Sequence, residues 1–72
     1  MREYAIYAKK LEFGDNRVEK LLDDFGLKIK CMSTSHSEWI IVYEAERQRK
    51  LTPKQIEQIE ANSLIYEIDA FY

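Results

Sequence analysis

The stretch WIIVYEAE, residues 39–46, opens with five large apolar residues in a row and then becomes charged. A strand with one face in solvent alternates apolar and polar residues, whereas a continuous apolar run is typical of a strand buried on both faces. We therefore predict a central strand here. Because the chain has only 72 residues, the question is what covers the second face of this strand.

Other segments alternate in the way expected of strands with one buried face. In residues 2–9, Tyr4, Ile6 and Ala8 share one face, while Ala5 and Tyr7 share the other. The polar residues 33–38 provide turn chemistry before the central strand. Strands are predicted at residues 2–9, 27–32, 39–46 and 64–71.

Two helices are predicted between these strands. Apolar residues recur at i, i+3, i+4 and i+7 from Val18 to Phe25, and Gly26 follows where a helix commonly ends with a positive φ. This pattern predicts a helix over 15–25, capped by Asp15 or by a capping box of Asn16 and Glu19.

The start of the second helix carries three signals together. Thr52 and Gln55 have the spacing of a capping box, Pro53 occupies the first helical position, and Leu51 is placed to pack on Ile56. The sequence therefore predicts a helix from 53 to 62.

The predicted order βαββαβ is that of the ferredoxin-like α+β fold. In this plan, two helices cover one face of a four-stranded antiparallel sheet, and the first and third strands lie in its middle. We expect a single domain over residues 1–72. The fold carries many unrelated functions, so function has to be argued from particular residues.

Composition narrows the class of protein. Eleven basic and thirteen acidic residues give a net charge of -2, without the basic excess that is typical of nucleic-acid binders. Residues 1–10 lack the apolar core and cleavage site expected of a signal peptide, and no run approaches the ~20 apolar residues of a membrane span, so we expect a cytoplasmic protein. A core this small is marginal, which favours association with another protein or with a second copy as a homodimer.

The residues offer little for metal or covalent chemistry. Cys31 is the only cysteine, which excludes an internal disulfide, and we expect it to be a buried strand residue. Cys31 and His36 supply too few ligands for a structural zinc ion. No nucleophile, base and orienting group can be named, so we expect no cofactor and no enzymatic activity.

The sheet face opposite the helices is the first candidate site. If Trp39, Ile41 and Tyr43 point outward, that face is large and aromatic, whereas the opposite register exposes Ile40, Val42 and two glutamates. The length of the preceding hairpin decides between the two registers, and a slip by one residue swaps them. The predicted protein-binding residues are Tyr7, Trp39, Ile41, Tyr43 and Phe71.

An acidic surface is the second candidate. The last third of the chain concentrates negative charge at Glu57, Glu60, Glu67 and Asp69. Such a surface can imitate the phosphates of DNA, as in phage-type inhibitors that occupy a basic, DNA-binding partner. The sequence thus predicts a small binding module or inhibitor that acts on another protein.

An alternative comes from residues 6–11, IYAKKL. They resemble the first-strand signature of RNA-recognition motifs, apolar–aromatic–apolar–x–Asn–Leu, with Lys10 in place of Asn. This resemblance implies single-stranded RNA binding, with bases stacked on Tyr7. The third-strand signature of the family is matched at Trp39 and Val42 only, and nearby glutamates would repel phosphate.

Overall fold

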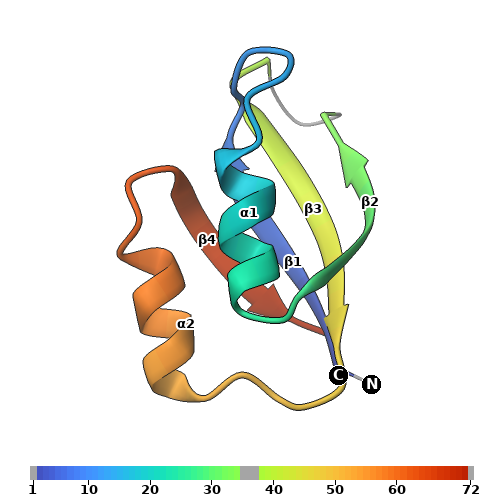
Figure 1. Cartoon of the computed structure of the whole chain (residues 1–72), viewed down its shortest axis with the longest axis vertical. Coiled ribbons are helices and arrows are strands. Elements are labelled where there is room, and N and C mark those ends of the chain that lie inside the picture. The colour runs from blue at the N-terminus through green and yellow to red at the C-terminus, as the bar shows by residue number, and fades with distance from the viewer. Residues whose placement is uncertain (1, 35–37, 72) are drawn as a thin grey trace.

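The computed structural model describes residues 2–34 and 38–71, and it has the predicted ferredoxin-like α+β fold. The antiparallel strands lie in the order β2-β3-β1-β4, with β1 and β3 in the middle. Both helices lie on one side of the sheet (Figure 1). The elements are β1 (Arg2–Lys9), α1 (Arg17–Asp24), β2 (Lys28–Ser33), β3 (Ile40–Arg47), α2 (Pro53–Glu60) and β4 (Ile65–Ala70).

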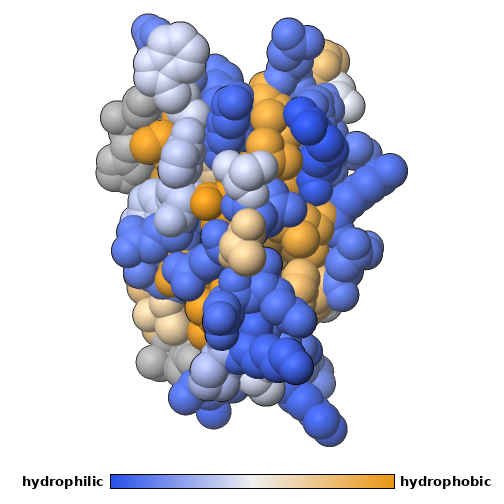
Figure 2. Space-filling model, turned by 90° about the vertical axis from the view of Figure 1, so that its left-hand side faces the viewer, coloured by the Kyte–Doolittle hydropathy of each residue, from blue (hydrophilic) through white to orange (hydrophobic). Residues whose placement is uncertain are grey.

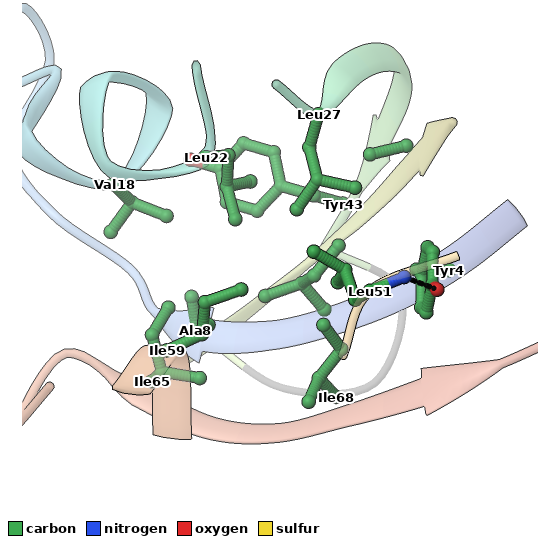
Figure 3. Packing of buried hydrophobic residues seen from close by; sticks show 12 residues of the cluster. Tyr4, Ala8, Val18, Leu22, Leu27, Tyr43, Leu51, Ile59, Ile65 and Ile68 are labelled. Carbon is green, nitrogen blue, oxygen red and sulfur yellow. Dashed lines mark hydrogen bonds between the residues drawn. The ribbon is translucent and has the colours of Figure 1, made fainter. Parts of the chain in front are cut away.

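The register of the two central strands decides which residues enter the core. Ile6 pairs with Tyr43, and Tyr4 pairs with Ala45. All four are buried, together with Val18 and Leu22 of α1 and Ile59 of α2. Figure 3 shows the ring of Tyr43 beside Leu22 and Leu27, beneath the helix layer. The core therefore lies between the helices and the alternate residues of β1 and β3.

Both outer strands pair with a shift of one residue. On β4, Ile65 pairs with Ala8 and Glu67 pairs with Tyr7, which leaves Tyr66 between them. On β2, Ile29 and Cys31 pair with consecutive residues of β3, so the register shifts at Lys30.

The end of α1 explains why Gly26 follows the helix. Gly26 has a φ of 73°, which a residue without a side chain adopts at little cost. Its N–H donates to the carbonyl of Asp23, and the N–H of Leu27 donates to the carbonyl of Leu22. This pair of bonds is a Schellman motif, and it turns the chain directly into β2.

The two helix starts differ in how well the sequence predicted them. The capping box of Thr52 and Gln55 is present, with Pro53 in the first turn of α2. The predicted capping box of Asn16 and Glu19 is wrong, because the Asn16 side chain makes no capping hydrogen bond. Asp15 instead accepts a hydrogen bond from the N–H of Arg17 at 3.2 Å.

The connection before α2 is fastened to the core through Tyr4. The N–H of Leu51 donates to the hydroxyl of Tyr4 at 2.7 Å, and both residues are buried (Figure 3). This bond satisfies a backbone donor that is removed from water. It therefore positions α2 on the same layer as α1.

Candidate functional site

The face of the sheet turned away from the helices, here called the open face, is the first surface to consider. It consists of the strand residues that alternate with the core residues. These are Glu3, Ala5, Tyr7 and Lys9 of β1, Ile40, Val42, Glu44 and Glu46 of β3, and Glu67, Asp69 and the adjoining Phe71 at β4.

Two predicted contact residues lie on the other face. Tyr43 is buried in the core, and Ile41 packs against it on the helix side. Trp39 precedes β3 and is exposed, with its carbonyl accepting a hydrogen bond from the N–H of Lys10 at 2.9 Å. The placement of Ile41 and Tyr43 on the open face is therefore wrong, because the hairpin register turns Ile40 and Val42 outward instead.

The hydroxyl group of Tyr43 forms a hydrogen bond at the border of the core. Its hydroxyl donates a hydrogen bond to a carboxylate oxygen of Glu19 on α1. Burial of the ring, followed by this hydrogen bond and the charge of Glu19, raises the pKa of Tyr43 well above its usual range. Glu19 thus serves as a link between α1 and β3 and does not close a capping box.

This raised pKa predicts a loss of stability at alkaline pH. Above about pH 10, tyrosine in the unfolded chain releases its proton while folded Tyr43 keeps it, so each pH unit removes up to about 1.4 kcal/mol. Below that pH both states hold the proton, and Tyr43 contributes no pH dependence. We expect urea unfolding to show a steeper alkaline decline in the wild type than in Tyr43→Phe.

The comparison with Tyr43→Phe is needed because Lys30 titrates in the same range. The pKa of Lys30 is raised by its hydrogen bond to Glu3 and by the Glu3 charge, and both variants share this contribution. Equal alkaline slopes in the two proteins would contradict the role given to Tyr43.

Part of the charge on the open face is neutralised within the sheet. The ammonium group of Lys30 lies 2.6 Å from a carboxylate oxygen of Glu3 and 3.9 Å from one of Glu46. The Lys30 hydrogen bond and charge hold the pKa of Glu3 below its usual range. Lys30 therefore offsets one of these two carboxylates, and the three residues together keep one net negative charge.

Cys31 also lies on this side of the sheet. Its thiol donates to a carboxylate oxygen of Glu44 at 3.0 Å, and that hydrogen bond raises the pKa of Cys31. The thiol is therefore held in its protonated form, which is the weaker nucleophile. The expected burial of Cys31 is wrong, because β2 is an edge strand and the residue is exposed.

Three carboxylates of the open face form no ion pair with any other residue in the ranges 2–34 and 38–71. Glu44 and Asp69 both pair with Ala5, from opposite sides, and Glu67 pairs with Tyr7. Neighbouring strands lie about 4.8 Å apart, so these three groups surround the middle of β1. Negative charge thus gathers around a small apolar centre.

The predicted acidic set is divided between two layers. Glu57 and Glu60 are exposed on α2, whereas Glu67 and Asp69 belong to the open face. Figure 2, which views the flank of the molecule, shows a mostly hydrophilic surface with hydrophobic residues visible between the polar ones. Glu44, which only the second of the two weighed registers exposes, was not among the predicted site residues, and it joins Glu67 and Asp69 once the register of β3 is known.

The apolar part of the open face is smaller than the alternative register would have made it. Ala5 and Val42 are almost fully covered by longer neighbours, and Tyr7 is half-buried. Phe71 is 59% exposed at the end of β4. Charged and aromatic side chains, in place of a third layer, thus cover the second face of β3.

Across residues 2–34 and 38–71, no group of three or more His, Cys, Asp or Glu side chains is arranged to hold a metal ion. His36, weighed above as a metal ligand, lies outside this range. No helix in the described part has both the length and the apolar character needed to cross a membrane. Comparison with protein-family models, curated proteins and solved structures found no match.

Proposed function

We propose that the protein is a non-enzymatic binding module whose open face docks a basic partner protein. The observation that carries this proposal is the group formed by Glu44, Glu67 and Asp69, which have no ion-pair partner among the described residues and surround Ala5 and Tyr7. A partner with arginine or lysine beside apolar side chains complements this face in both charge and hydrophobicity.

The charge of the open face favours a different protein, and not a second copy of this chain, as its binding partner. Stacking two open faces would bring Glu44, Glu67 and Asp69 close to the same residues of the other copy. Like charges facing one another across an interface are destabilising. A basic protein avoids this repulsion and gains electrostatic steering during its approach.

DNA mimicry is one form of this proposal, in which the partner uses its DNA-binding surface. The open-face carboxylates that form no ion pair among the described residues support it, while Glu57 and Glu60 contribute from a separate layer.

RNA binding is supported less well by the same face. Tyr7 lies on the open face, as the resemblance to RNA-recognition motifs implies, but it pairs with Glu67, and Tyr43 is in the core. Tyr7 is half-buried beside a carboxylate, and the exposed Phe71 adjoins the end of β4 and not a central strand, so this face is a poor platform for stacking bases and binding phosphate.

The test is an NMR titration with a defined probe, a short peptide that alternates arginine and isoleucine. We expect shifts concentrated at Ala5, Tyr7 and Val42, with an affinity that falls as salt is added. A peptide alternating glutamate and isoleucine and a single-stranded oligouridine serve as comparison ligands.

Two double variants with the same net charge separate the open face from general acidity. Glu44→Lys with Asp69→Lys should weaken peptide binding by about tenfold or more, because closely placed charge pairs are lost. Glu57→Lys with Glu60→Lys on α2 should leave the affinity within about twofold. Equal loss in both variants, or oligouridine binding at Tyr7 in place of the peptide, would overturn the proposal.

A further inference from the structure

A second surface lies away from the open face, at the loop between β1 and α1. Phe13 is fully exposed in this loop at 109%, and Met32 at the end of β2 is 58% exposed. Trp39, 74% exposed, adjoins the loop through the hydrogen bond between its carbonyl and the N–H of Lys10. Three large apolar side chains are therefore exposed at one end of the sheet. None of them belongs to the core or to the open face.

The loop holds Phe13 in a defined position. The N–H of Asp15 donates to the carbonyl of Glu12 at 3.0 Å, which closes a turn with Phe13 and Gly14 as its central residues. Gly14 has a φ of 90°, as a type II turn requires at that place. The turn thus presents Phe13 at its corner and fixes its backbone, so that binding has to order only the exposed side chain.

Beside Phe13 lies an open hollow that can accept an aromatic side chain. Its volume is about 270 Å³, and its apolar walls include Leu11, Met32, Ile41 and Tyr43. A protruding ring and a hollow with an apolar part therefore occur on one surface, and Phe13 itself forms part of the wall of the hollow. Such a surface is self-complementary, because each copy can offer its ring to the hollow of the other around a two-fold axis.

The charges at this surface are also compatible with binding to a second copy of the chain. Asp15 is paired with Arg17 at 2.8 Å, and Glu19 accepts the hydroxyl of Tyr43. Lys10 and Glu12 remain at the rim, one of each sign and without an ion pair in the described part of the chain. A two-fold arrangement can therefore set Lys10 of one copy against Glu12 of the other, whereas the open face offers mostly carboxylates.

We infer that this surface joins two copies of the chain, with Phe13 of each copy inserted into the hollow of the other. Phe13, Met32 and Trp39 together offer on the order of 400 Å² per copy, about half of the 800 Å² per partner in a standard interface. The dimer is therefore weak and concentration-dependent, and it leaves the open face free for its partner.

Light scattering and sedimentation equilibrium from low to high micromolar protein test this inference. The wild type should shift from monomer to dimer over that range, and Phe13→Ser should weaken association by about tenfold or more. Phe71→Ser removes the same residue type from the open face and is the matched control. It should dimerise like the wild type, and circular dichroism checks that both variants are folded.

A charge exchange adds a test that requires a second copy. Lys10→Glu alone should weaken the dimer, and Lys10→Glu combined with Glu12→Lys should restore it. A wild type that stays monomeric throughout, a Phe13→Ser variant that associates like the wild type, or equal losses in Phe13→Ser and Phe71→Ser would each overturn the inference. None of these outcomes depends on whether a basic protein binds the open face.

Discussion

Tyr43→Ala should remove most of the stability of this protein. Replacing a buried aromatic residue by alanine costs about 3 to 5 kcal/mol, against about 4 to 11 kcal/mol in total for a chain of this length. Tyr43 is 4% exposed, packs beneath α1 and binds Glu19, so its loss leaves both a cavity and an unpaired carboxylate. Urea unfolding followed by circular dichroism measures the effect.

The matched control is Trp39→Ala, only four positions away. Trp39 is 74% exposed, so we expect its loss to change the free energy of unfolding by less than about 1 kcal/mol. A small effect for Tyr43→Ala would mean that β3 presents the opposite face to the helices, and a large effect for Trp39→Ala would mean that the Trp39 side chain is packed against the protein and not exposed.

Ile59→Ala should detach α2 from the sheet. Ile59 is fully buried, and it is the only buried residue of α2 (Pro53–Glu60). Its truncation should therefore cost about 2 to 5 kcal/mol, at the upper end if the helix cannot settle into the cavity. Hydrogen exchange should show the amides of α2 losing protection first, because the helix has no other deep anchor.

Ile56→Ala makes the same chemical change one turn earlier. Ile56 is only partly buried against the core, so the loss of stability should be clearly smaller than for Ile59→Ala. Equal losses at the two positions would show that α2 is held along its length and not by one side chain.

The order and approximate bounds of the elements follow from the sequence because their signals are local. Alternation within 2–9, Gly26 after α1, and Thr52 with Gln55 before α2 each concern residues within a few positions of one another. The structure confirms all three. Local propensity and global fold agree at these places.

The orientation of β3 does not follow from local signals. Its apolar run offers two nearly equivalent faces, and the choice depends on pairing with β1 and with β2, where the register shifts at Lys30. For the same reason the sequence placed Ile41 and Tyr43 outside and did not gather Glu44 with Glu67 and Asp69. Likewise, the approach of Tyr43 to Glu19 is a tertiary contact that no capping pattern reveals.

The register shifts on both outer strands affect whether strands from other molecules can pair with the edges of the sheet. A regular edge offers its free backbone groups as a template for strands from other molecules, which is a route to fibrils. Here an incoming strand would meet backbone donors and acceptors out of step at Lys30 on β2 and at Tyr66 on β4, the two opposite edges of the sheet. The two register shifts therefore disfavour the addition of a fifth strand at either edge of the sheet.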